Sequence, residues 1–291
     1  MPSSLPSIER ARPLLGTTVS IRVHGLSDTD AHSAIDEAFE DIALIHRLMS
    51  FHETDSDVSR LNREAADRPI EVHPATFDVL KHADEMSQQS GGCFDITIAP
   101  RLVAEGLLPS PAAHHAPDPQ ATWEDVSLEP HQHVRFRRPL WIDLGGIAKG
   151  YAVDRAMEKL RARGAVQACV NAGGDLSVHG PDSESVLLRT GQAPGDVVPV
   201  LEIENAAVAS SGFSTYRSLD PGPHIDGRSR RPTPAGRFVS VVADHCVVAD
   251  ALTKVVLALE EQSEPVLRHY RASAHLLDSL GQWRHFGHAA G

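Results

Sequence analysis

Apolar side chains recur at every third or fourth position in four stretches of the chain, which is the spacing of an amphipathic helix. The clearest stretch covers residues 31–49, where the apolar positions form one stripe. Another begins at Pro74, a residue type favoured in the first turn of a helix, and stops before Gly91 and Gly92. We therefore expect helices over residues 31–49, 74–90, 151–163 and about 248–259.

Other stretches alternate apolar with polar residues or are rich in β-branched residues, which is typical of strands. Residues 15–23 and 139–143 follow this pattern, and residues 92–97 predict a strand with Asp95 and Thr97 on one side. The second half holds most of the expected strands, over residues 166–170, 176–179, 186–189, 198–203, 206–210 and 238–242, with a closing hairpin over 273–283. This mixture predicts an α+β fold with mainly antiparallel sheets and flanking helices.

The length of 291 residues fits two domains, or one large domain built from two lobes, at roughly 150 residues per domain. Residues 108–119 are too rich in proline for regular structure and suit a surface loop or a lobe boundary. We expect a single domain over residues 1–291, with a division into two lobes near residues 109–121 as one arrangement of it.

The chain is acidic, with 27 Lys and Arg against 39 Asp and Glu and a net charge of −12 when His is neutral. No run of Lys and Arg reaches the density of a nucleic-acid or lipid-binding patch, so we expect no nucleic-acid partner. An anionic ligand would need a local positive pocket made from helix N-termini, a metal ion, or a few Lys and Arg.

Cysteine usage and the N-terminus indicate a compartment. Cys93, Cys169 and Cys246 are far apart, which suits neither a disulfide framework nor a CxxC metal site. The N-terminus lacks the basic-then-apolar pattern of a signal peptide, and no run of about 18 apolar residues occurs. We expect a cytoplasmic protein that does not insert into a membrane.

Residues 141–154 are the strongest candidate for chemistry. A strand ending at Asp143, then Gly145 and Gly146, then an opening helix would bring backbone N–H groups and a positive dipole end to one point. With Lys149 beside it, such a point suits a phosphate group. The spacing matches neither the phosphate-binding loop nor the dinucleotide fingerprint, so a tight turn with a solvated Lys149 explains it equally well.

Two other segments allow both a structural and a functional interpretation. Gly173 and Gly174 join two expected strands, so they either serve a hairpin turn or let a planar ligand rest against the backbone. Asp95, at the start of its expected strand, is either a turn acceptor or a ligand contact.

Asp250, Thr253 and Lys254 share roughly one face at the start of the last predicted helix. A hard cation such as Mg²⁺ prefers a carboxylate and neutral oxygens, which Asp250 and Thr253 could supply. Asp250 and Lys254 are equally an ordinary i,i+4 ion pair.

Eight segments resemble, in the same order, the motifs of the ApbE family of FAD-dependent FMN transferases. One such match would be weak, whereas eight in order are a strong signal, and residues 143–150 and 171–175 are near-identical to family motifs. The segments are residues 15–18, 49–62, 92–100, 143–150, 171–175, 210–212, 224–226 and 249–252.

The resemblance implies a two-lobed ApbE-like fold with FAD between the lobes and Mg²⁺ on the FAD pyrophosphate. By motif position, the residues implied to contact or line FAD are Leu15, His52, Cys93, Phe94, Asp95, Asp143, Lys149, Gly173 and Gly174. Those implied to bind Mg²⁺ are Gly146, through its backbone carbonyl, Asp250 and Thr253. The implied catalytic residues are His224, Asp250 and Lys254, with His224 as the proton acceptor.

The chain departs from the family pattern at several positions. Leu15 replaces a Met, and His52 replaces a Tyr, so an imidazole or no ring would stack on the flavin. Lys254 stands four residues after Asp250, where the family has its metal-binding Thr. Either Thr253 reaches the metal or the Lys254 ammonium takes over part of its role, and we expect a metal site that Lys254 weakens or alters.

The implied activity is Mg²⁺-dependent transfer of FMN from FAD to an acceptor flavoprotein. A Thr or Ser hydroxyl of the acceptor attacks the FMN phosphorus, a phosphoester forms, and AMP leaves. One alternative is an FAD pyrophosphatase, in which water replaces the hydroxyl. A second is a non-catalytic FAD-binding protein, which the departures at His52, Pro223 and Lys254 would suit.

Overall fold

The computed structural model describes residues 7–188, 200–212 and 224–287. Pro223, residue 189 and residues 198–199, which the sequence interpretation includes, lie outside this part of the chain. Among the helices described, none combines the length and apolar character needed to cross a bilayer.

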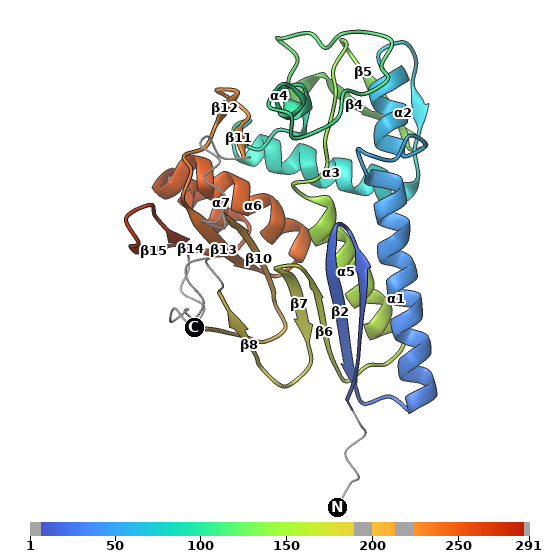
Figure 1. Cartoon of the computed structure of the whole chain (residues 1–291), viewed down its shortest axis with the longest axis vertical. Helices are drawn as coiled ribbons and strands as arrows, with labels where there is room; N and C mark the ends of the chain where they lie inside the picture. Colours follow the sequence, from blue (N-terminus) through green and yellow to red (C-terminus); the bar gives the residue numbers. More distant parts are fainter. Residues whose placement is uncertain (1–6, 189–199, 213–223, 288–291) are drawn as a thin grey trace, which may run out of the picture.

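One large antiparallel sheet forms the lower half of the molecule in Figure 1. Its strands pair in the order β1-β2-β6-β7-β10-β13-β14-β15. Their bounds are Ile8–Leu14, Thr17–His24, Gln167–Ala172, Asp175–His179, Ala207–Gly212, Phe238–Ala243, Ser273–Leu277 and Trp283–Gly287. The antiparallel sheet expected from the second half of the sequence is therefore confirmed.

Three helices cover one face of this sheet (Figure 1) and bury a continuous apolar core against it. They are α1 (Asp28–Met49), α5 (Ala148–Ala162) and α6 (Cys246–Leu259). Two short helices, η3 (Glu260–Ser263) and α7 (Glu264–His269), follow α6. A hairpin of β8 (Glu184–Leu187) and β9 (Val200–Ile203) packs on the other face through a small apolar cluster.

A smaller unit lies above the sheet in Figure 1. It contains α2, α3, α4, the short helices η1 and η2, and a three-stranded sheet of order β3-β5-β4. These elements are Asp57–Glu64, Pro74–Gln89, Ala99–Ala104, Ile96–Ile98, Trp123–Asp125, Ile70–Glu71, His133–Phe136 and Val126–Glu129, in the order named. Next to it, β11 (Ile225–Asp226) and β12 (Arg231–Pro232) form a two-stranded hairpin.

The four helices predicted from periodicity are confirmed as α1, α3, α5 and α6. The proline-rich stretch 108–119 is irregular, as expected. Because β3 before this stretch pairs with β5 after it, both sides belong to the smaller unit. The pairing therefore argues against a lobe boundary near residues 109–121.

The predicted strand over residues 139–143 is wrong, because its backbone bonds to a side chain rather than to a strand. Asn62 of α2 accepts a hydrogen bond from the Ile142 N–H (2.7 Å) and donates one to the Ile142 carbonyl (3.0 Å). The Asp143 N–H donates to the Ile96 carbonyl at 2.8 Å. Asn62 thus holds the extended segment that leads to Asp143.

We predict that Asn62→Ala lowers the free energy of unfolding by about 2–4 kcal/mol, because it leaves two buried backbone groups without partners. Urea unfolding measures the loss. Gln167→Ala is the matched control, since the Gln167 side chain makes the same two bonds to the Asp182 backbone, at 3.1 Å and 2.8 Å, but Asp182 is exposed. Water replaces those bonds, so the control should cost about 1 kcal/mol or less. Equal losses would contradict this explanation.

Candidate active site

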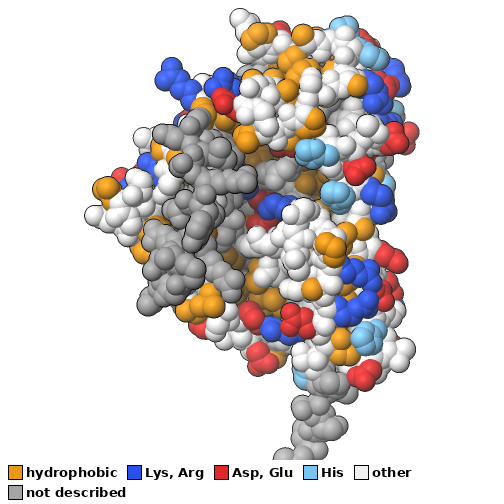
Figure 2. Space-filling view, viewed as in Figure 1, with side chains coloured by type: hydrophobic (Ala, Val, Ile, Leu, Met, Phe, Trp, Pro, Cys, Tyr) orange, Lys and Arg blue, Asp and Glu red, His pale blue; other side chains and the backbone are white. Residues whose placement is uncertain are grey.

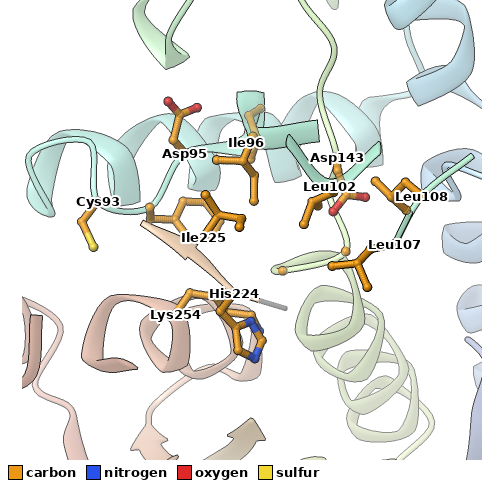
Figure 3. Close-up of a pocket in the computed structure, with 14 residues that line it drawn as sticks. Cys93, Asp95, Ile96, Leu102, Leu107, Leu108, Asp143, His224, Ile225 and Lys254 are labelled. Atoms are coloured by element: carbon orange, nitrogen blue, oxygen red, sulfur yellow. The ribbon is translucent and has the colours of Figure 1, made fainter. Parts of the chain in front are cut away.

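A cavity of about 350 Å³ lies between the smaller unit and the helices of the large sheet. Figure 2 shows this region as a hollow, with basic and acidic side chains at its floor. Its apolar wall comes mainly from η1, α4 and β11, and its polar side from the turn before α5 and from α6 (Figure 3). The predicted site residues that line it are Cys93, Phe94, Asp95, Asp143, Gly146, His224 and Lys254.

At the floor, the Lys254 ammonium forms an ion pair with Asp250 Oδ1 and donates to the Asp250 carbonyl oxygen at 3.0 Å. Asp250 Oδ2 accepts the Gly150 N–H at 3.1 Å, and the side chain is fully buried. Burial alone would raise the pKa of Asp250, but Lys149, Lys254 and this N–H outweigh it and hold the pKa below its ordinary value. Asp250 is therefore a carboxylate.

A second ion pair, between Lys149 and Asp175 of β7, lies close to the first. Burial and the neighbouring Asp250 raise the pKa of Asp175 to about 6, against the effect of Lys149. Burial lowers the pKa of Lys149, but Asp250 and Asp175 more than reverse this and raise it above its ordinary value. We call Lys149, Asp175, Asp250 and Lys254 the Lys–Asp cluster; with all four ionised its charges sum to zero.

The sequence interpretation missed Asp175, although this residue ends the motif of residues 171–175. Its role depends on the packing of α5 against β7, which residue spacing alone does not reveal. Lys149 is not the solvated side chain of the tight-turn alternative, because Asp175 pairs with it.

Close contact between α5 and α6 brings the two ion pairs together. A Cβ atom on Gly150 would lie 2.3 Å from the Cys246 carbonyl oxygen, so only glycine allows this approach. Asp154 of α5 also accepts the N–H groups of Cys246 and Val247, both at 2.8 Å, and so caps the start of α6. The position of Asp250 is thus fixed from α5.

Backbone N–H groups in the turn before α5 and in its first turn donate to carboxylates of the protein itself. The N–H groups of Gly145 and Leu144 are directed at the Asp143 carboxylate, whose pKa is nevertheless raised because burial outweighs them. Together with the bond from Gly150 to Asp250, this satisfies N–H groups that were expected to bind phosphate. Binding of a phosphate group by the remaining N–H groups of this segment stays a prediction.

Asp95 accepts hydrogen bonds from the Thr97 N–H (2.7 Å), the Thr97 hydroxyl (2.8 Å) and Arg230 Nη2 (2.9 Å). It caps the short helix η1, so the strand predicted over residues 92–97 is wrong. The contact of Asp95 with FAD stays a prediction. In Figure 3 its carboxylate points away from His224 and Lys254. Arg230, which the sequence interpretation missed, ties the hairpin β11–β12 to the smaller unit.

His224 lies at the start of this hairpin, beside Lys254 (Figure 3). The Gly227 N–H donates to the Cys93 carbonyl at 2.9 Å, and the Thr233 N–H donates to the His224 carbonyl at 2.7 Å. Burial and then the Lys254 charge lower the pKa of His224 to about 3. Its imidazole is therefore neutral.

The remaining residues implied to contact FAD lie outside the cavity lining. Leu15 is in the turn between β1 and β2, and His52 is exposed after α1. Gly173 and Gly174 form the two-residue turn between β6 and β7 with φ of +68° and +110°, so the hairpin explains both glycines. Their contact with FAD stays a prediction.

The three residues implied to bind Mg²⁺ lie close together but do not offer an open site. Both oxygens of Asp250 are bonded, and the Thr253 hydroxyl donates to the Asp250 carbonyl at 2.7 Å. The Lys254 chain packs on Gly146, where an added Cβ would lie 3.4 Å from Lys254 Cε. Within the described ranges, no group of three or more His, Cys, Asp or Glu side chains could hold a metal ion. As placed, these residues do not fit Mg²⁺.

Comparisons with solved structures show which proteins share this fold. A flavin transferase ApbE structure from Vibrio cholerae has a TM-score of 0.81 at 21% identity, covering 97% of both chains. An ApbE protein structure from Thermotoga maritima has a TM-score of 0.83 at 23% identity, also covering 97% of both. The α+β fold expected for a flavin transferase is thus confirmed.

Sequence comparison narrows the class to one family. The sequence model of the ApbE family matches residues 15–276. A curated FAD:protein FMN transferase from Vibrio cholerae is 26% identical over 273 residues, covering 86% of this chain and 80% of that protein. The chain belongs to the ApbE family, which confirms the resemblance drawn from its eight motifs.

We predict that His224 makes folding stability depend on pH. The imidazole of the unfolded chain takes up a proton near pH 6.5, whereas the folded one resists protonation down to about pH 3. The contribution of His224 is therefore complete above pH 6.5 and is lost as the pH falls toward 3, by at most about 1.4 kcal/mol per pH unit.

Urea unfolding of the wild type and of His224→Gln across this range measures the effect. The wild type should lose stability faster than the variant as the pH falls, because glutamine does not titrate. A difference between the two proteins that stays constant with pH would show that His224 ionises as freely in the folded state as in the unfolded state.

Proposed function

We propose that this chain is an FAD:protein FMN transferase, which attaches FMN to a Thr or Ser hydroxyl of an acceptor flavoprotein and releases AMP. Membership of the ApbE family and the name of the Vibrio cholerae relative support this activity. The observation that carries it is the cavity, whose apolar wall suits a flavin or adenine ring and whose floor presents the Lys254 ammonium, which suits phosphate.

In the proposed reaction, the acceptor oxygen forms a bond to the FMN phosphorus while the bond from that phosphorus to the AMP oxygen breaks. AMP leaves with the electron pair, and the hydroxyl proton passes to a base. Such a transfer depends on positioning and on charge stabilisation at the phosphates. Lys254 is placed to stabilise charge because it lines the cavity.

His224 is the proposed proton acceptor. It lines the same cavity as Lys254 and is neutral before substrate binds. An anionic phosphate next to the imidazole would favour its protonated form, which raises its pKa when FAD is bound. The proton of the acceptor hydroxyl would therefore move to a ring nitrogen of His224.

Magnesium dependence was expected from the family resemblance alone. Since the oxygens of Asp250 and Thr253 are already bonded, we assign no step of the reaction to a metal ion.

The activity test combines the purified chain with FAD and an acceptor fragment bearing an Asp-x-x-Ser/Thr-Gly-Ala-Thr segment. We predict an FMN adduct on the fragment by mass spectrometry and an equal amount of AMP by chromatography. Free FMN and AMP without an adduct would indicate a pyrophosphatase instead. Intact bound FAD without AMP would indicate a non-catalytic flavin-binding protein.

We also predict that His224→Gln slows adduct formation by roughly 10²–10⁴-fold, the usual effect of losing a general base, and leaves FAD affinity nearly unchanged. His32→Gln is the control, because His32 is exposed on α1 and outside the cavity lining. An unchanged rate in His224→Gln would assign proton acceptance to another group.

A further inference from the structure

The Lys254 ammonium is surrounded by oxygen atoms in the way a bound cation would be. It pairs with Asp250 Oδ1, donates to the Asp250 carbonyl oxygen at 3.0 Å, and lies 3.5 Å from Ser211 Oγ. Its side chain is 16% exposed, packs on Gly146, and lines the cavity (Figure 3). The ammonium is therefore held at the floor with access to a ligand.

We propose that Lys254 is the resident cation of this site and takes the place of a divalent metal ion at the FAD pyrophosphate. FAD binding then requires no Mg²⁺. This inference rests on the proposed function, because it concerns how the same cavity binds FAD.

The charge balance of the Lys–Asp cluster supports the proposal. Asp250 and Asp175 are each paired with an ammonium, so a metal ion would have to compete with Lys254 and Lys149 for these two carboxylates. Mg²⁺ also demands close octahedral oxygen ligands at about 2.0–2.1 Å. To supply them, Asp250 would have to give up its ammonium, and the positive Lys254 would have to leave the cavity floor.

The oxygen atoms near the Lys254 ammonium are also hydrogen-bonded to one another. The Asp250 carbonyl oxygen accepts from both the Thr253 hydroxyl, at 2.7 Å, and Lys254. Thr253 Oγ1 and Ser211 Oγ lie 2.9 Å apart. This arrangement is a closed hydrogen-bond network around an ammonium.

Asp250 and Lys254 have the spacing of an ordinary helix-surface ion pair, but their surroundings differ from a surface. Asp250 is completely buried, and the ammonium lies at the cavity. An ammonium has three N–H donors, and Asp250 takes two of them. One donor remains for Ser211 or a phosphate oxygen, which a surface ion pair would offer only to water.

Calorimetric titration of FAD into the full chain, in EDTA and in excess MgCl₂, tests the proposal. The wild type should bind FAD with the same affinity in both. Lys254→Thr should bind FAD roughly tenfold to a hundredfold more weakly in EDTA, the effect of losing one charged hydrogen bond, and MgCl₂ should restore the binding.

A second readout uses MgCl₂ alone, without FAD. Because a ligand that binds only the folded state stabilises it, MgCl₂ should raise the melting temperature of Lys254→Thr and leave that of the wild type unchanged. Lys159→Thr is the matched control, since Lys159 lies on α5 and only approaches Asp41, at 3.7 Å. It should behave as the wild type in every titration.

Lys254→Thr leaves the buried Asp250 carboxylate without its ammonium, which destabilises the fold. The double variant Asp250→Asn, Lys254→Met removes both charges and should bind FAD weakly with or without MgCl₂. FAD binding by the wild type only when MgCl₂ is present, or heat of MgCl₂ binding to the wild type, would overturn the proposal and leave the proposed function intact. Loss of FAD binding by the wild type in both buffers would overturn the proposed function itself.

Discussion

The buried carboxylate of Asp250 is the constraint on which the site depends. A carboxylate removed from water is stable only when it is paired and hydrogen-bonded. Here Gly150 supplies an N–H group and Lys254 supplies the counter-charge. Gly150 also allows α5 to approach α6. Residues 150, 250 and 254 therefore depend on one another, because replacing any of them leaves the buried Asp250 carboxylate without one of its partners or displaces it.

The contact between α5 and α6 also helps to set the shape of the cavity. Helices of the large sheet supply the floor, and the smaller unit supplies most of the apolar wall. Asn62 holds the segment that leads to Asp143, while Arg230 bonds Asp95 and connects the β11–β12 hairpin to the smaller unit. Two polar side chains thus align an apolar surface with a charged one, which is what a ligand with rings and phosphates requires.

Periodicity predicted the four long helices because each packs one apolar stripe against a sheet or another helix. Periodicity failed at residues 139–143, where the Asn62 side chain takes the place of a neighbouring strand. It also did not predict β1, in which charged residues occupy several of the alternating positions. Motif spacing identified most polar residues of the cavity floor. It missed three residues whose partners are distant in the chain, Asp175, Ser211 and Arg230. Contacts between elements, rather than residue types, decide their roles.

Anomalous diffraction from crystals of the full chain grown with FAD and MnCl₂ tests directly whether the Lys254 ammonium is the cation of the FAD site, since Mn²⁺ prefers the same oxygen ligands as Mg²⁺ and its position can be observed. We predict a pyrophosphate oxygen within hydrogen-bond distance of Lys254 Nζ and no manganese peak at Asp250. A manganese peak bound by Asp250 and Thr253, with Lys254 turned away, would show that a metal ion is the cation of the site.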